Sequence, residues 1–256
     1  MIHPTAIVDG GAQIHESVEI GPYCIVGPHV QIGAGTRVGP HTVLEGRTEI
    51  GENNQIFHHA SIGAVPQHAK YRGEPTRLTI GSENIIREFV TIHLGTVEDR
   101  GITTVGNRNL LMAYAHVAHD CTLEDGIVLA NAATLGGHVY VERNAILGGL
   151  VGVHQFVRVG RHAIIGGMSG VRLDVPPFVR ASGISSKLYG LNTVGLERSG
   201  FSREEIQNLR MAYRILFQSG ELLQAAAESV QAELGDDPNV EYLVAFLKKS
   251  ERGFCR

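Results

Sequence analysis

The sequence of 256 residues lacks tryptophan, and aromatic residues make up only 6% of it. Its three cysteines are an odd, scattered set, which fits a reducing compartment better than a disulfide framework. No apolar run is long enough to span a bilayer, and the first residues lack the basic and apolar regions of a signal peptide. These absences predict a cytoplasmic protein without membrane insertion.

Glycine, in contrast, is abundant, with 32 residues, and an aliphatic residue recurs at every sixth position. A helix repeats every 3.6 residues and a single strand every two, so a strict period of six indicates a hexapeptide β-helix. The 26 anchor positions are all Ile, Val or Leu: Ile2, Val8, Ile14, Ile20, Val26, Ile32, Val38, Leu44, Ile50, Ile56, Ile62, Ile80, Ile86, Ile92, Val105, Leu111, Val117, Leu123, Leu129, Leu135, Val141, Leu147, Val153, Val159, Ile165 and Val171.

Three hexads make one triangular coil of 18 residues, and stacked coils form a prism with the anchors in its core. The fourth residue after each anchor is usually small, and Cys24 and Cys121 occupy this slot, which predicts that both are buried in the core. The residue after the anchor is often glycine, which we expect to supply the backbone angles of the corners.

The period is interrupted twice. The stretch between Ile62 and Ile80 carries Pro66, Gly73 and Pro75, and the step from Ile92 to Val105 is 13 residues. Both interruptions predict loops that leave the prism, and long loops on a rigid repeat usually carry function.

The repeat stops after Val171, and helical signals follow. Ser202 and Glu205 form a capping box before an amphipathic stretch that ends near Ser219. Further helices are expected over about 221–234 and from Pro238 onward. The sequence therefore predicts a mainly β chain of two domains, a β-helix over 1–189 and a helical domain over 190–256.

The stretch "AHVAHDCT" places polar residues within the unbroken part of the repeat. Residues 18 positions apart there occupy the same place in successive coils and therefore stack in one column. His119 then stacks with Gly137 and Gln155, and Asp120 stacks with His138, with His154 nearby. A neutral histidine can act as a general base, a carboxylate can orient it, and a bare glycine N–H can bind an oxyanion. We expect an acyl-transfer site without a protein nucleophile, with His119 at the prism edge, where its removal costs little stability.

Other interpretations remain open on the residues alone. A zinc site at His116 and His119 is disfavoured because residues three apart on an extended chain point to opposite sides, although metal could bind between coils as in hexapeptide carbonic anhydrases. An acetyl-CoA-dependent transferase and a non-enzymatic scaffold are the remaining alternatives. Residues 158–214 hold 9 Lys and Arg against 4 Asp and Glu, which suggests an acidic partner.

Longer motifs resemble one family along the whole chain, the acyl-ACP–UDP-N-acetylglucosamine O-acyltransferases of lipid A synthesis. They are "KYRGEPTRL", "IREFVTIHLGT", "NLLMAYAHVAHDC", "GGHVYV", "VHQFVRVG", "GVRLDVPPF" and "GLERSGFSRE". The resemblance implies a left-handed β-helix, a cytoplasmic homotrimer with sites between neighbouring prisms, and transfer of a 3-hydroxyacyl group from acyl carrier protein to the glucosamine 3-hydroxyl. It implies no cofactor beyond the carrier's phosphopantetheine, no metal and no nucleic acid.

The resemblance also assigns residues. His119 corresponds to the general base, with Asp120 beside it, and Gly137 to the oxyanion donor. The residues that correspond to substrate contacts are Gln67, Lys70, His116, His138, His154, Gln155, Asn192 and Arg198. Three positions depart from the family pattern: His68 replaces a common Asp, Val194 a common Glu, and Ser199 a second Arg. A 3-amino sugar therefore stays open beside the 3-hydroxyl sugar as the acceptor.

Two glycine pairs, Gly148-Gly149 and Gly166-Gly167, lie one 18-residue coil apart. Stacked glycines would leave a groove without side chains, in which an acyl chain could lie. Gly167 corresponds to the position that limits chain length in the family, and the neighbouring Met168 can shorten the chain that fits. We expect a preference for acyl groups of the 3-hydroxytetradecanoyl class.

Overall fold

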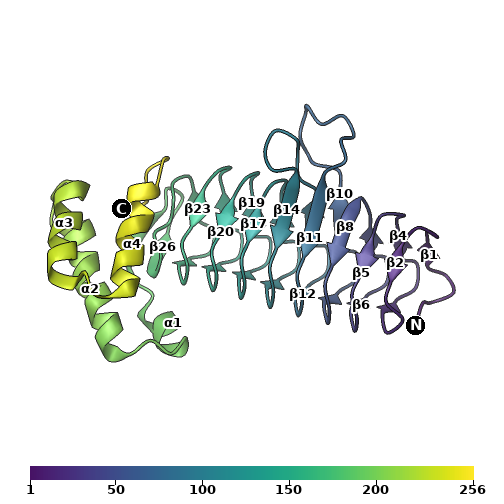
Figure 1. Ribbon diagram of the computed structural model, residues 1–256, viewed down its shortest axis with the longest axis horizontal. Coiled ribbons are helices and arrows are strands. Elements are labelled where there is room, and N and C mark those ends of the chain that lie inside the picture. The colour runs from purple at the N-terminus through teal and green to yellow at the C-terminus, as the bar shows by residue number, and fades with distance from the viewer.

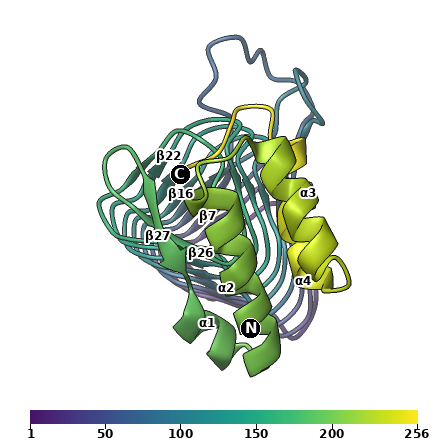
Figure 2. The same ribbon diagram turned by 90° about the vertical axis from the view of Figure 1, so that its left-hand side faces the viewer.

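The computed structural model describes residues 1–256 and consists of a long prism of short strands with four helices at one end (Figure 1). The strands form three sheets, in which every neighbouring pair is parallel except β26 and β27. Seen from the helical end, the coils superpose as a triangular column (Figure 2). The structure confirms the predicted parallel β-helix with C-terminal helices.

Each sheet is one face of the prism, and its strands follow one another along the axis. The nine-stranded sheet contains β1 (Ile7–Val8), β4 (Ile25–Val26), β7 (Val43–Leu44), β10 (Ser61–Ala64), β13 (Thr91–His93), β16 (His116–Val117), β19 (Thr134–Leu135), β22 (Gly152–Val153) and β25 (Gly170–Val171). The eight-stranded sheet contains β2 (Gln13–Ile14), β5 (Gln31–Ile32), β8 (Arg47–Ile50), β11 (Arg77–Ile80), β14 (Ile102–Val105), β17 (Thr122–Leu123), β20 (Tyr140–Val141) and β23 (Arg158–Val159). The ten-stranded sheet contains β3 (Glu19–Ile20), β6 (Arg37–Val38), β9 (Gln55–Ile56), β12 (Ile85–Ile86), β15 (Leu110–Leu111), β18 (Val128–Leu129), β21 (Ile146–Leu147), β24 (Ile164–Ile165), β26 (Val179–Ser182) and β27 (Lys187–Leu191).

The register follows the predicted 18-residue coil. Leu111 pairs with Leu129, which pairs with Leu147, and the same step reaches Ile165. All anchors from Ile20 to Val171 are buried, whereas those of the first coil are more exposed because no coil covers them on one side. The core is thus a column of aliphatic side chains, each packed on the coils above and below.

The corners correct one expectation. Non-glycine residues with positive φ turn the chain, as at Asp120 (φ 59°) and His138 (φ 62°), and Asp, Asn and His tolerate this region better than most residues. Among the glycines that follow an anchor, only Gly63 has a positive φ. Most of the others are needed for close approach, because a Cβ at Gly33 would lie 2.8 Å from the carbonyl carbon of Gly51 on the next coil, whereas a Cβ at Gly27 would come no closer than 3.5 Å to its neighbours.

The buried corner slots hold small side chains, as predicted. Cys24 and Cys121 are free and fully buried. Burial raises the pKa of the Cys121 thiol to about 12, which makes a thiolate nucleophile there unfavourable.

The helices are α1 (Thr193–Arg198), α2 (Arg203–Gln218), α3 (Leu223–Leu234) and α4 (Pro238–Lys249). The predicted capping box of Ser202 and Glu205 begins α2, and Pro238 is the first residue of α4. Sequence analysis did not predict α1, β26 or β27. The division into domains at residue 190 stays a prediction, and β27 crosses it. None of the helices has the length and apolar character that a membrane span requires.

A buried polar cluster attaches α4 to the prism. The Glu142 carboxylate accepts hydrogen bonds from the Tyr242 hydroxyl (2.8 Å), the Arg161 N–H (2.8 Å) and the Arg158 Nε–H (2.7 Å). The Arg161 guanidinium lies 3.7 Å from the centre of the Tyr242 ring. The helices therefore close the C-terminal end of the prism and leave its sides open.

Two loops leave the prism where the period is interrupted, as predicted. The 65–76 loop joins β10 to β11, and the 94–101 loop joins β13 to β14. They project together from one region of the prism (Figures 1 and 2). They lie near the corner between β16 and β17, which carries His119 and Asp120.

Candidate active site

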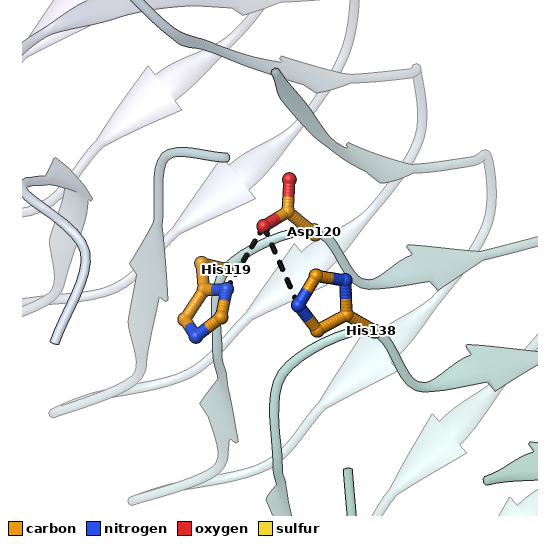
Figure 3. A group of neighbouring side chains, drawn as sticks. All are labelled: His119, Asp120 and His138. Atoms are coloured by element: carbon orange, nitrogen blue, oxygen red, sulfur yellow. Dashed lines mark hydrogen bonds and ion pairs between the residues drawn. The ribbon is translucent and has the colours of Figure 1, made fainter. Parts of the chain in front are cut away.

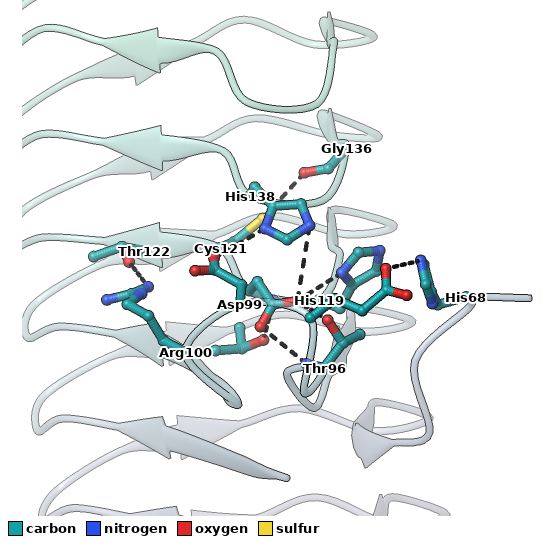
Figure 4. A network of polar contacts seen from close by, with 12 residues as sticks. His68, Thr96, Asp99, Arg100, His119, Cys121, Thr122, Gly136 and His138 are labelled. Carbon is teal, nitrogen blue, oxygen red and sulfur yellow. Dashed lines mark hydrogen bonds and ion pairs between the residues drawn. The ribbon is translucent and has the colours of Figure 1, made fainter. Parts of the chain in front are cut away.

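His119 lies at the corner between β16 and β17, but loops cover it. Its side chain is only 10% exposed, because the His68 ring packs edge-on at 5.1 Å and the 94–101 loop lies beside it (Figure 4). His119 thus lies at the prism edge, as predicted, but its ring is buried, so we now expect its removal to cost stability. The ring belongs to a packed site.

Asp120 orients the His119 ring. Its Oδ2 lies 2.9 Å from His119 Nδ1 and also accepts the Thr96 hydroxyl at 2.7 Å, while Oδ1 accepts the Thr96 N–H at 2.9 Å (Figures 3 and 4). The Asp120 N–H donates to the Thr103 hydroxyl at 2.8 Å. Burial raises the pKa of the Asp120 carboxyl, but the hydrogen bonds from His119 and Thr96 outweigh it, and the pKa lies below its usual value. An ionised Asp120 accepts a hydrogen bond from His119 Nδ1–H, which leaves the lone pair of His119 Nε2 available to accept a proton.

Gly137 lies one coil beyond His119, and its missing side chain makes room for the imidazole. A Cβ at this position would lie 2.5 Å from His119 Cε1 and 2.7 Å from Nε2. The Gly137 N–H makes no hydrogen bond within the chain. The predicted stacking of these two residues is confirmed, and the free Gly137 N–H lies one coil from the His119 ring.

His138 continues the column above Asp120. Its Nε2 lies 3.9 Å from Asp120 Oδ2, and its Nδ1 lies 2.9 Å from Oδ2 of Asp99 on the 94–101 loop (Figure 4). The ring stacks on the Phe156 ring, with centroids 4.3 Å apart, and packs edge-on against the His119 ring, with centroids 5.1 Å apart. A cleft of about 520 Å³ opens here, lined by Glu98, Asp99, Arg100, Asp120, Thr122, His138, Val139, Tyr140 and Phe156.

The 65–76 loop contributes side chains from the other side. Lys70 is 76% exposed, and its Nζ lies 3.2 Å from Glu98 Oε1. His68, one of the departures from the family pattern, lies 3.4 Å from Glu98 Oε2. Gln67 is exposed and makes no side-chain hydrogen bond. The loop thus presents the Lys70 ammonium and the Gln67 amide, while its His68 ring packs on His119.

His116 lies on the outer face of the nine-stranded sheet, with Nδ1 2.7 Å from the Thr91 hydroxyl oxygen. His93, which sequence analysis did not single out, packs edge-on against it at 5.1 Å. Burial, followed by the charges of His116 and His119, lowers the pKa of His93 to about 4, and its buried Nδ1 has no partner. The break in the period directly after Ile92 was the signal that could have identified it.

The remaining predicted residues do not reach this site within one chain. His154 and Gln155 lie one coil beyond Gly137, both exposed, with His154 Nδ1 3.3 Å from Arg252. Asn192 is buried: its Oδ1 accepts the Gly195 N–H that starts α1, and its Nδ2 donates to the His162 carbonyl. Arg198 ends α1 at the helical end of the prism (Figure 1).

Gly167 and Met168 lie on a different edge of the prism from His119. They follow β24 of the ten-stranded sheet and precede β25 of the nine-stranded sheet, whereas His119 lies between the nine- and eight-stranded sheets. The predicted stacking of the glycine pairs is confirmed, since a Cβ at Gly167 would lie 3.1 Å from the Gly149 carbonyl oxygen. Met168 is 73% exposed beside them.

His119, Asp120 and His138 are also the residues that could hold a metal ion, with possible ligand atoms within 4.8 Å of one another (Figure 3). Asp120 Oδ2 already interacts with the His119 ring and the Thr96 hydroxyl. His138 Nδ1 is paired with Asp99. The donor pattern fits an oriented acid–base pair, in which the Nδ1 atoms of His119 and His138 are held by carboxylates and His119 Nε2 stays free.

Comparisons with known proteins agree along the full length. Residues 174–255 match the family model "Udp N-acetylglucosamine O-acyltransferase; Domain 2", and residues 11–46 match the bacterial transferase hexapeptide model. The acyl-[acyl-carrier-protein]–UDP-N-acetylglucosamine O-acyltransferase of Thiobacillus denitrificans is 52% identical over 255 residues, covering 100% of this chain and 99% of the relative. LpxA from Acinetobacter baumannii superposes with a TM-score of 0.97 at 45% identity, and UDP-N-acetylglucosamine O-acyltransferase from Moraxella catarrhalis with 0.95 at 45%. Each covers 100% of this chain and 99% of the solved one.

His93 makes the stability of the protein depend on pH. In the unfolded chain a histidine binds a proton below about pH 6.5, whereas folded His93 stays neutral down to about pH 4. The unfolded state therefore binds more protons between these values, and stability falls as the pH is lowered through this window. We expect His93→Gln to reduce this loss by up to about 3 kcal/mol, measured by denaturant unfolding at pH 6.5 and 4.5. The same change at the exposed His29 should leave the loss as in wild type, and an equal loss in the His93 variant would contradict this assignment.

Proposed function

Because the chain belongs to the acyl-[acyl-carrier-protein]–UDP-N-acetylglucosamine O-acyltransferase family, we propose that His119 is the general base of acyl transfer. The enzyme transfers an acyl group from acyl carrier protein to UDP-N-acetylglucosamine, which we assign to the first step of lipid A synthesis. The observation that carries the proposal is the His119 ring, oriented by buried Asp120 and lying against the bare α-carbon of Gly137.

The reaction follows from that geometry. His119 Nε2 removes the proton of the sugar 3-hydroxyl, and the oxygen attacks the thioester carbonyl carbon of the carrier-bound acyl group. The ionised Asp120 stabilises the imidazolium through Nδ1. The tetrahedral intermediate collapses with cleavage of the C–S bond, and the Nε2 proton passes to the leaving phosphopantetheine sulfur. The products are the ester and the free thiol, and no cofactor or metal is required.

Gly137 supports the second half of the mechanism. Its N–H has no acceptor within the chain and lies beside the base. We assign it to the oxyanion that develops on the thioester oxygen, where one such donor typically contributes about 10²–10³-fold in rate. Glycine is required there for a second reason, because any side chain would displace the imidazole.

The substrate contacts fall into two groups. Those near the proposed base within one chain are Gln67, Lys70, His116 and His138, whereas the proposed contacts His154 and Gln155 lie one coil beyond Gly137. Arg198 lies at the helical end, and we assign it to the nucleotide or to the pantetheine arm. Asn192 acts as its positioning residue, because its amide starts the α1 helix that ends with Arg198. Val194 and Ser199, which depart from the family pattern, lie on this same segment.

We propose a homotrimer with sites between neighbouring prisms. The outer face of the ten-stranded sheet carries an apolar stripe formed by Ile85, Leu110, Val128, Ile146 and Ile164. The adjacent edge carries a ladder of stacked rings, 4.9–5.1 Å apart, formed by Tyr23, His41, His59, Phe89 and Tyr114. Burying these surfaces would bring one chain's ten-stranded sheet toward another chain's His119. A monomer in sedimentation velocity would contradict this arrangement.

Acyl carrier protein is the proposed macromolecular partner, and it is strongly acidic. The basic segment 158–214 includes the exposed Arg198 and spans the last coils of the prism, α1 and most of α2 (Figure 1). We propose the cytoplasm as the location, where acyl carrier protein and the nucleotide sugar occur together.

Removal of the base tests the mechanism. We expect His119→Ala to lower kcat by at least about 10²-fold, with the KM for UDP-N-acetylglucosamine changed only a few-fold. The melting temperature should also fall, because the ring is buried and hydrogen-bonded, so rates are compared well below it. His29→Ala, at an exposed position, serves as the control. Turnover within a few-fold of wild type would place the base elsewhere.

The length of the acyl chain that the enzyme accepts gives a further prediction. We propose that Gly167 limits the chain, so that wild type prefers 3-hydroxytetradecanoyl over 3-hydroxydecanoyl carrier protein, since each buried methylene contributes about 0.8 kcal/mol. Gly167→Met should invert the preference in kcat/KM, because the new side chain would fill the space beside Gly149. Gly10→Ala is the matched control, since a Cβ at Gly10 meets nothing within 4 Å. An unmoved preference in the Gly167 variant would exclude this role.

A further inference from the structure

Two adjacent carboxylates at the tip of the 94–101 loop contact side chains that we propose to bind substrate. Glu98 lies 3.2 Å from Lys70 Nζ through Oε1 and 3.4 Å from His68 Nε2 through Oε2. Asp99 lies 2.9 Å from His138 Nδ1. A single loop tip therefore contacts Lys70 of the 65–76 loop and the His138 ring at the same time, and Figure 4 shows Asp99 beside His138.

The loop is held in place on both sides of this tip. Thr96 is buried and gives two hydrogen bonds to Asp120. The Arg100 guanidinium donates to the Thr122 hydroxyl at 2.6 Å, and the Gly101 N–H donates to the Thr96 carbonyl at 3.0 Å. Because Asp120 and Thr122 belong to the rigid prism and the Gly101–Thr96 bond closes the loop on itself, the tip has few alternative positions, and Glu98 remains near Lys70 in the free protein.

The pairs made by the tip differ in strength from those that hold the loop. Lys70 is 76% exposed and Glu98 44% exposed. An exposed pair of this kind shifts an equilibrium by at most about fivefold. The Asp120 contacts, in contrast, are fully buried. The Glu98–Lys70 pair is therefore one that an anionic ligand can break while the loop stays in place.

We propose that Glu98 is an internal competitor of the anionic substrate. Its carboxylate occupies Lys70 and His68 in the free enzyme, and it must leave when the diphosphate of the nucleotide sugar reaches Lys70. Glu98 thereby sets substrate affinity without taking part in the chemistry, and Asp99 keeps the tip beside the site through His138. This inference rests on the proposed function, in which Lys70 binds UDP-N-acetylglucosamine.

The test is equilibrium binding of UDP-N-acetylglucosamine by calorimetry, together with steady-state kinetics of the full-length protein. Glu98→Gln removes the charge and keeps the shape, so we expect Kd and KM to fall about two- to fivefold with kcat unchanged. Glu16→Gln, an exposed and unpaired acid far from the site, is the control and should match wild type. If Glu98 merely supported the loop, the variant would raise KM, and that result would overturn the proposal.

A double-mutant cycle separates this proposal from the function on which it rests. Lys70→Ala alone should weaken binding, and Glu98→Gln added to it should then have no further effect. Weaker binding in Lys70→Ala with no gain in Glu98→Gln would leave the role of Lys70 intact and reject the competition. No change in Lys70→Ala would reject the role of Lys70 and the competition with it. An equal gain in both backgrounds would mean that Glu98 repels the ligand directly, and it would also contradict exchange at Lys70.

Discussion

The stacking of 18-residue coils is the constraint on which the site depends. Away from the two loops, each coil lies on the next in fixed register, so a residue at one corner meets the residue 18 positions later. Across the loops the partners are further apart in sequence, as in the pairs Ser61–Thr91 and Thr91–His116. Backbones at strand spacing, about 4.8 Å apart, leave no room for many side chains, which is why Gly137 must be bare for the His119 ring to fit. The prism thus provides a rigid support on which one imidazole, one carboxylate and one free N–H meet.

The contacts of Asp120 in the site are buried and strong, whereas the ion pair of Lys70 is exposed and weak. Asp120, which orients the base, is buried and accepts hydrogen bonds from His119 and Thr96. Lys70 is held only by an exposed ion pair, and such pairs contribute about 0–1 kcal/mol. The proposed base His119 is therefore fixed in the free protein, whereas the proposed binding group Lys70 stays exchangeable, as general acid–base catalysis and reversible binding respectively require.

The six-residue period was sufficient to predict the features whose positions it determines. It predicted the three-sided prism, the two loops, the capping box of α2 and the columns that join His119 to Gly137 and Asp120 to His138. It did not predict that loops cover His119 or that Glu98 reaches Lys70, because a loop without a period gives no register from which contacts follow. His93 was missed for the same reason, since it lies just beyond the last anchor before a loop. The glycines after the anchors were found but misread, because close approach between coils cannot be told from a turn by sequence alone.

The central claim is that coil register presses His119 against the bare Gly137 and so fixes the base. Gly137→Ala tests it most directly, because its Cβ would lie 2.5 Å from the imidazole and force the ring to move. A displacement of this kind should lower kcat by about 10²-fold, while the KM for UDP-N-acetylglucosamine changes little and Gly10→Ala behaves as wild type. A Gly137→Ala enzyme with wild-type kcat would contradict the account.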